Sequence, residues 1–552
     1  MEKRSSYSSL IAVALIALSL LNSPAAAARK AGFRFINRGE VNTLDPNRMS
    51  WMQDIRIGYA LWEGLYALDP DTLDPVPGAA VKIDVSEDKT VYTFHLRPEG
   101  KWSNGDTVTS ADFVFAWRRM LEEPGDYTYL FYYIKGAQDY EKAFTSNPAM
   151  ADFKTVGIEA PDATTLVVRL SHPVTFLADL CAFPPFFPLN EKSMQPFKQT
   201  DKTGRVSYGG EFIRPPNLIT NGPFKLVSWT LKVGQRLEAN PFYWDAKNVK
   251  VKSIEAVSVD DNLLAYQKYD QGEVDWLAEP TGEIAAEMKK AGRKDIHVFP
   301  SFGTYFYSIN CQPKLPGDRV NPMADARVRQ ALAMSIDKQP IVDNVTRLEE
   351  PITSQYIPAS SFPKYKAPPG LPKDFAKAQE LLAAAGYPGG KGFPKLTLLF
   401  NTEGDHKPIA EYIRKQWADH LGINVELEGV EIKQFSQRLH NKDYDIARAS
   451  WYGDYNDVST FTDKFKSDSL NNDAGWINPK YDELLKQADV ETDVQKRLDI
   501  LAEAEAILLK EAPLIPLYHY VNKYAFRDNV QGIPLNPRNM VVFKKITAGR
   551  GN

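Results

Sequence analysis

The sequence predicts an α/β fold, and two observations carry this prediction. From residue 33 onward, short runs rich in β-branched and aromatic residues alternate with segments whose apolar residues recur at helical spacing. Hydrophobic residues make up 43% of the chain and charged residues 25%, which is ordinary for a globular protein and excludes bulk disorder. The 552 residues are enough for about three to four domain-sized units.

The first 28 residues are typical of a secretory signal peptide. Lys3 and Arg4 give a basic start, residues 10–21 are mostly apolar, and Pro24 precedes four alanines that offer a cleavage site. The apolar stretch is too short to cross a membrane as a helix, and no Cys follows it to take a lipid. We therefore expect export to the periplasm with residues 1–28 removed.

The next predicted elements are strands and helices in alternation. Residues 91–96 have the period of two that is typical of a half-buried strand, and so do residues 165–170. Between them, Thr109 or Ser110 caps an amphipathic helix. Further along, the same reasoning predicts helices over 376–385, 409–421 and 487–511, and strands over 396–400, 423–427 and 515–520.

The side-chain inventory favours binding over catalysis. The chain has 28 Phe, 26 Tyr and 10 Trp but only 7 His and 2 Cys. It contains no His-Glu-x-x-His, Cys-x-x-Cys, Gly-x-Ser-x-Gly or Walker-type motif, so we expect no enzyme activity, no metal and no cofactor. The net charge of −4 gives no basic face for nucleic acid. Whether Cys181 and Cys311 form a disulfide is left open.

Several segments resemble the family-5 extracellular solute-binding proteins of ABC importers. They occur in the family's order and include Thr-Leu-Asp-Pro at 43–46, Leu-Trp-Glu-Gly-Leu at 61–65 and Thr-Asn-Gly-Pro-Phe-Lys at 220–225. Further matching segments lie at 92–97, 101–106, 110–117, 240–244, 325–332 and 443–456. Each match alone is modest, but together they extend over most of the predicted mature chain.

This resemblance implies a large two-lobed periplasmic binding protein of type II with an inserted subdomain. A first lobe would comprise 29–62, 187–302 and 523–552, the subdomain 63–186, and a second lobe 303–522. The lobes would close on a ligand by a hinge motion. The implied function is to capture oligopeptides as a monomer and deliver them to the permease subunits of an ABC importer.

The resemblance also implies residues that bind the peptide. Asp454 matches the acidic anchor for the peptide ammonium, with a loop-capping role as the alternative. Arg448 matches an Arg near the ligand's backbone or carboxylate, and the alternative is an ion pair with Asp445 or Asp454. Further candidates are Arg438, Tyr305, Tyr307, Trp451, Tyr520, His406 and, from the subdomain, Tyr127. For each aromatic residue a place in the core is an equal alternative.

The chain also departs from the family pattern. Some members have a pair of cysteines where this chain has Gly303 and Tyr452, and some have Glu where it has Ser308. These differences leave the peptide length and side-chain preference open. Other ligands on the same fold are a murein tripeptide, a dipeptide, an opine or nickel, although the sequence shows no His cluster that would bind nickel. A secreted hydrolase or a chaperone-like protein is the alternative of another class.

Overall fold

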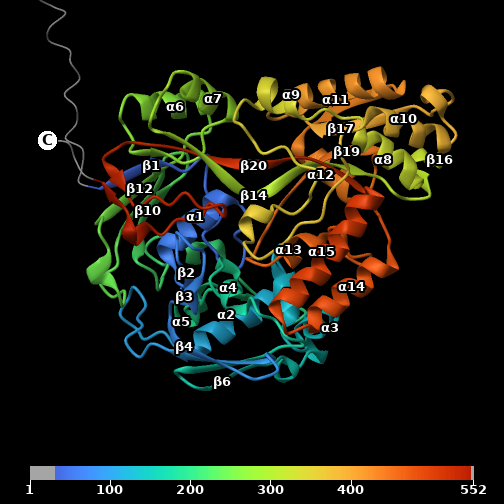
Figure 1. The fold of residues 1–552 in the computed structure, drawn as a ribbon. Helices are drawn as coiled ribbons and strands as arrows, with labels where there is room; N and C mark the ends of the chain where they lie inside the picture. The colour runs from blue at the N-terminus through green and yellow to red at the C-terminus, as the bar shows by residue number, and fades with distance from the viewer. Residues whose placement is uncertain (1–31, 549–552) are drawn as a thin grey trace, which may run out of the picture.

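The computed structural model describes residues 32–548, so the predicted signal peptide lies outside the described residues. The chain forms a two-lobed α/β protein in which two long strands, β14 (Ile296–Ile309) and β20 (Leu514–Phe526), run from one side of the molecule to the other (Figure 1). Within 32–548, no helix is both long enough and apolar enough to cross a membrane. The two-lobed arrangement of helices and strands confirms the predicted fold class.

One mixed sheet joins the two sides. Its strand order is β10-β11-β12-β1-β13-β20-β14-β19-β17-β18, so the long strands β20 and β14 lie at its centre. The other eight strands are β1 (Phe33–Ile36), β10 (Phe224–Thr230), β11 (Gly234–Ala239), β12 (Ser253–Val257), β13 (Trp276–Leu277), β17 (Leu396–Asn401), β18 (Val425–Val430) and β19 (Ile446–Tyr452).

The two long strands pair with each other in antiparallel fashion along nearly their whole length. Ile296 pairs with Ala525 at one end and Ser308 with Leu514 at the other. The register shifts between Pro300 and Thr304, which is a bulge in β14. On its other edge β14 pairs with β19, so β19 reaches the centre of the molecule.

Helices cover the sheet and fill the remaining space. The α-helices are α1 (Met52–Leu61), α2 (Ser110–Glu122), α3 (Ala137–Ser146), α4 (Leu177–Leu180), α5 (Glu191–Met194), α6 (Asn262–Asp270), α7 (Gly282–Lys290), α8 (Ala326–Met334), α9 (Gln339–Ile341), α10 (Phe375–Ala384), α11 (His406–Leu421), α12 (Ile432–His440), α13 (Ser459–Thr462), α14 (Pro479–Val490) and α15 (Val494–Glu511). In Figure 1, α6 and α7 lie at the opposite end of the long strands from α8, α10 and α11.

A second, antiparallel sheet lies away from the long strands, with the order β4-β5-β7-β6 (Figure 1). Its strands are β4 (Ala80–Val85), β5 (Val91–Leu96), β6 (Ile158–Asp162) and β7 (Thr165–Arg169). Two-stranded ribbons are formed by β2 (Tyr66–Leu68) with β3 (Pro75–Pro77), β8 (Lys198–Thr200) with β9 (Val206–Tyr208), β15 (Lys314–Leu315) with β16 (Arg319–Val320), and β21 (Val530–Gln531) with β22 (Thr547–Ala548).

Three large hydrophobic cores fill the molecule. The first core takes its buried residues from 33–299 and 524–546 and also includes Tyr455. The second and third cores take theirs from 302–518. The change of core near residues 300 and 520 agrees with the predicted lobe limits, but the limits themselves stay a prediction.

Three segments that carry the family resemblance meet at Glu63. Its carboxylate accepts hydrogen bonds from Tyr243 Oη at 2.9 Å and from Trp244 Nε1 at 2.6 Å. Its backbone exchanges two further bonds with the Asn221 side chain, at 3.1 and 2.7 Å. These residues therefore have a structural role, because they tie α1 to the turns on either side of β10 and β11.

Most predicted elements agree with the structure. The predicted cap at Thr109 is confirmed as a capping box with Asp112. The prediction of one long helix over 487–511 is wrong, because the chain forms α14 and α15 with a break between them. Asp493 starts the second helix, since its side chain accepts a hydrogen bond from the Lys496 amide.

The two cysteines do not form a disulfide. Both Cys181 and Cys311 are free thiols, and Cys181 is fully buried. Burial raises the pKa of Cys311 to about 11 and that of Cys181 well above its usual value. Both therefore stay protonated at neutral pH and behave as small apolar residues.

Candidate functional site

The candidate site is built around Asp454, two residues beyond the end of β19. Its carboxylate accepts a 2.6 Å hydrogen bond from Tyr129 Oη, and its amide donates to Thr460 Oγ1 at 2.9 Å. Arg538 donates to its backbone carbonyl at 3.0 Å. A nearby threonine and residues from two distant parts of the sequence therefore hold Asp454 in place.

The Asp454 carboxylate carries a charge that the protein does not neutralise directly. Arg538 is the nearest candidate, but its guanidinium pairs with Asp179 at 2.6 Å. Among the described residues, the Asp454 carboxylate has no ion-pair partner. Burial raises its pKa to about 6, against the lowering effects of the Tyr129 hydrogen bond and the Arg538 charge. A ligand cation would relieve this cost.

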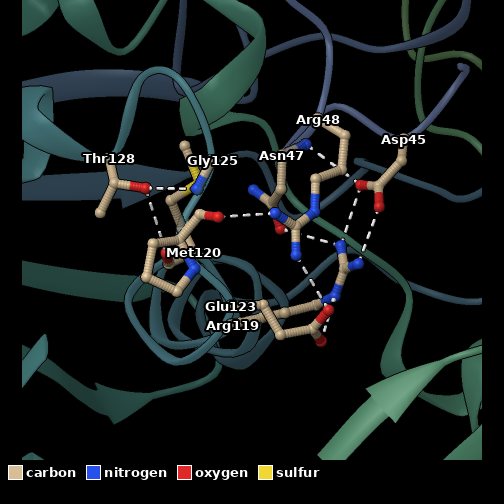
Figure 2. Close-up of polar contacts among 9 residues, drawn as sticks. Asp45, Asn47, Arg48, Arg119, Met120, Glu123, Gly125 and Thr128 are labelled. Carbon is tan, nitrogen blue, oxygen red and sulfur yellow. Dashed lines mark hydrogen bonds and ion pairs between the residues drawn. The ribbon is translucent and has the colours of Figure 1, made fainter. Parts of the chain in front are cut away.

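Tyr129 lies on a short 3₁₀ helix, η1 (Thr128–Tyr133), which a polar network fixes (Figure 2). Arg119 from α2 forms a two-pronged ion pair with Asp45, at 2.9 and 2.7 Å, and is only 5% exposed. Thr128 Oγ1 accepts from the Gly125 amide at 2.7 Å. The network joins the end of α2 and the start of η1 to the segment at 43–46, and thereby sets where Tyr129 points.

Arg448, on β19, is surrounded by aromatic rings. Its guanidinium donates to Tyr520 Oη at 3.3 Å and lies 5.4 Å from the centre of the Tyr305 ring. Within residues 32–548 it has no ion pair, and its buried Nε atom has no hydrogen-bond partner. The alternative ion pair with Asp445 is not present, because Asp445 pairs with Arg319. Arg448 is thus a cation without a carboxylate.

Tyr305 and His406 complete this side of the site. Tyr305 Oη is 3.2 Å from His406 Nδ1, and the Tyr305 ring stacks on Tyr518 with centroids 4.9 Å apart. His406 begins α11, and burial together with the Arg448 charge lowers its pKa to about 3. The imidazole is therefore neutral at physiological pH. It can donate or accept a hydrogen bond, but it adds no charge.

Other predicted site residues lie elsewhere. Tyr307 is fully buried in the second core beside Trp417. Trp451 points to the third core, where its Nε1 donates to the Thr460 carbonyl at 2.7 Å. Arg438, on α12, pairs with Glu428 at 2.6 Å and also lies beside Asp443. Tyr307 nevertheless pairs with Arg448 across β14 and β19. Trp451 and Arg438 have no hydrogen bond or ion pair with Asp454 or Arg448 among the described residues.

The subdomain tyrosine that bonds Asp454 is Tyr129, and a ligand contact by Tyr127 stays a prediction. Tyr127 packs edge-on against Phe183 with centroids 4.9 Å apart, near Asp454 but without a hydrogen bond to it in the described structure. The hydrogen bond comes from Tyr129, two residues further on. Sequence reasoning missed Tyr129 and also Arg538, which supports Asp454. The run of tyrosines at 127–133 was the signal for Tyr129, but it does not say which ring reaches across.

Contacts between the subdomain and the segment after β19 extend beyond Asp454. Phe176 stacks on Tyr455 with centroids 4.6 Å apart and ring planes 13° apart. Tyr133 Oη lies 3.1 Å from Tyr455 Oη and 3.3 Å from a carboxylate oxygen of Asp463. The structure is therefore closed at this side of the site.

The fold and these residues define a ligand-binding protein with two lobes joined by crossing strands, and comparisons with known proteins agree. The family model of the bacterial extracellular solute-binding proteins, family 5 (middle region), matches residues 74–473. The chain belongs to this family.

Relatives extend over nearly the whole chain. The oligopeptide-binding protein OppA of Bacillus subtilis is 34% identical over 494 residues, 88% of this chain and 86% of the relative. The periplasmic oligopeptide-binding protein OppA of Salmonella typhimurium is 31% identical over 503 residues, 90% and 88% of the two chains. The solved structure of the Escherichia coli murein tripeptide-binding protein MppA, 29% identical, superposes with a TM-score of 0.79 and covers 95% of this chain and 99% of its own.

Proposed function

We propose that this protein is the periplasmic substrate-binding component of an ABC importer and that it captures oligopeptides between its lobes. The observation that carries the proposal is a pair of unmatched charges. Asp454 has no cation partner and Arg448 has no carboxylate partner among the described residues. A free peptide carries an ammonium at one end and a carboxylate at the other, and so complements both.

The position of the two charges fits an extended ligand. Arg448 lies within β19 and Asp454 follows its end, six residues further along the chain. At about 3.3 Å per residue, an extended segment of this length spans roughly 20 Å. The long Arg448 side chain can shorten this gap, so the two charges suit a short extended peptide.

The rest of the proposal follows from the family. We propose two lobes that close on each other by bending β14 and β20. The first lobe comprises 29–62, 187–302 and 523–552 and carries the subdomain 63–186, and the second lobe comprises 303–522. We propose that the protein is exported by residues 1–28, acts as a monomer and passes its ligand to permease subunits in the membrane. It binds peptide without cleaving it, so bound peptide is recovered intact by mass spectrometry.

The test is calorimetric titration of trialanine and N-acetyl-trialanine into the wild-type protein and Asp454→Asn. Wild-type protein should bind trialanine, and both N-acetylation and D454N should weaken binding by about 2–5 kcal/mol. N-acetyl-trialanine binding to D454N should lose little more binding free energy than either change alone, because both changes remove the same ion pair. Failure of the wild-type protein to bind di- to pentapeptides would sink the proposal.

A murein tripeptide is the second candidate ligand. It is favoured by the similarity to the Escherichia coli murein tripeptide-binding protein at a TM-score of 0.79. The same titration decides between the two, because a murein-specific protein should bind the murein tripeptide much more tightly than trialanine.

A further inference from the structure

Tyr452, the last residue of β19, has an unusual packing arrangement. Its ring stacks on Tyr520, with centroids 5.0 Å apart and planes 15° apart. Its edge lies against the backbone of Gly303, its partner across β14 and β19. A Cβ atom at Gly303 would lie only 2.6 Å from the Tyr452 ring. The ring therefore occupies space that only a glycine at position 303 leaves free.

The Tyr452 ring is accessible to water and yet enclosed by protein. The side chain is 50% exposed, although it lies at the centre of the molecule between the two lobes. Burial raises the pKa of its hydroxyl well above the usual value, and Arg448, Glu279 and Arg38 are the charged groups nearest to it. A half-exposed ring at this place borders on solvent between the lobes.

The placement of Tyr452 relates it to both unmatched charges. It follows Arg448 by four residues on β19, and Asp454 comes two residues after it, in a bend just beyond the strand. A peptide anchored at Asp454 and running toward Arg448 would pass the ring within its first three residues, since strand and peptide rise by about 3.3 Å per residue. One face of the ring is taken by Tyr520, which leaves the other for the ligand.

We propose that Tyr452 is a specificity-determining residue, whose free ring face binds an aromatic side chain within the first three residues of the peptide. This inference rests on the proposed function. A second aromatic ring is the favoured partner because it covers the exposed face, extends the stack with Tyr520 and leaves the polar edge of Tyr452 free toward Arg448 and Glu279.

A purely structural role would not leave the ring half uncovered. Tyr305 and Tyr307, on the neighbouring strand, are fully buried and pack within a core. Tyr452 instead leaves half of its surface uncovered. The free face of the Tyr452 ring, rather than the face stacked on Tyr520, therefore favours a ligand-binding role over a packing role.

The experiment compares four tripeptides by calorimetric titration: trialanine and its three variants with Phe at the first, second or third position. Wild-type protein should bind one of the Phe peptides about two- to tenfold more tightly than trialanine. Tyr452→Phe should keep this preference, since it keeps the ring. Tyr452→Leu should lose the preference but still bind trialanine, since Leu retains apolar volume beside Gly303.

Phe242→Leu is the matched control, because Phe242 is also a half-exposed aromatic residue, 44% exposed, but lies beside Gly105. It should leave the preference unchanged. Equal affinity of wild-type protein for all four peptides, or a preference that survives in Y452L, would overturn the inference. Neither result would contradict the proposed function, which fails only if the wild-type protein binds neither trialanine nor any longer or shorter peptide.

Discussion

Tyr129 and Asp454 are 325 residues apart in the sequence and joined by a 2.6 Å hydrogen bond. The tyrosine belongs to the predicted subdomain and the aspartate to the segment after β19. The bond thus holds two separately built parts of the molecule together at the carboxylate that we propose as the ammonium anchor. It stabilises both the charged form of Asp454 and the closed arrangement.

Tyr129→Phe should weaken peptide binding on the order of tenfold at neutral pH. The variant removes a hydrogen bond to a charged group, and such a bond contributes about 1.5–3 kcal/mol. Only part of this energy affects binding, because the bond is present both with and without ligand. Calorimetric titration with trialanine measures the effect. Tyr132→Phe is the matched control, because the Tyr132 hydroxyl contacts Glu141 at 3.3 Å instead. Equal losses in both variants would show that the bond to Asp454 has no special role.

Peptide affinity should fall as the pH falls below about 6. The pKa of Asp454 is raised to about 6, so its carboxylate takes up a proton in this range and no longer attracts an ammonium. Tyr129 and Arg538 both lower this pKa, and the ligand ammonium would lower it further. Affinity should therefore be greatest near pH 7 and decrease toward tenfold per pH unit below 6. It should also decrease above about pH 8, where the peptide ammonium loses its proton.

Titrations between pH 5 and pH 8 test this dependence, and Asp454→Asn should abolish it. At pH 6, binding should also release protons, which makes the measured enthalpy depend on the ionisation heat of the buffer. An affinity of the wild-type protein that does not change between pH 7 and pH 5 would contradict the assignment of Asp454 as the anchor.

Arg448→Met should reduce the preference for a free peptide carboxylate without lowering the melting temperature of the unliganded protein. A cation without a carboxylate partner stabilises the fold little, because desolvation offsets its contacts. Wild-type protein should therefore bind trialanine more tightly than trialanine amide, by about 2–5 kcal/mol. In R448M the two should bind alike. A large drop in melting temperature would instead indicate a structural role.

Glu63→Ala should destabilise the protein by about 2–4 kcal/mol and leave peptide affinity unchanged. The change leaves the Tyr243 hydroxyl and the Trp244 indole N–H without the acceptor they share. Urea unfolding measures the loss, and trialanine titration of the folded fraction measures the affinity. Glu63→Gln keeps an acceptor and should cost less. An affinity loss in E63A as large as in D454N would show that Glu63 also supports the site.

Local signals were sufficient to predict much of the fold. The capping box at Thr109 and Asp112 and the glycine after α11 each mark a helix end within a few residues. The break between α14 and α15 was not predicted because helical periodicity continues through it. Only the cap at Asp493 marks the break, and an Asp among other acidic residues is an inconspicuous signal.

The site was harder to predict than the fold. Tyr305 and Phe306 are neighbours on β14 and pack in different cores, Tyr305 in the second and Phe306 in the third. Alternation cannot say which face holds the ligand, because both faces of β14 are covered. Which tyrosine reaches Asp454 depends on how η1 is placed, and that placement involves distant contacts such as the pair of Arg119 and Asp45 beside the start of η1 (Figure 2).

The first hydrophobic core has a consequence for how the chain folds during its synthesis. Phe33 and Phe35 pack in that core with residues from the other end of the sequence, among them Tyr524, Met540 and Phe543. The buried residues of the second and third cores all lie between 302 and 518, and Tyr520 also packs against the second core. A chain made from its N-terminus can therefore complete the middle of the sequence first. Its earliest segments must remain incompletely packed until the last ones arrive, a period in which a chaperone or the export machinery can hold them unfolded.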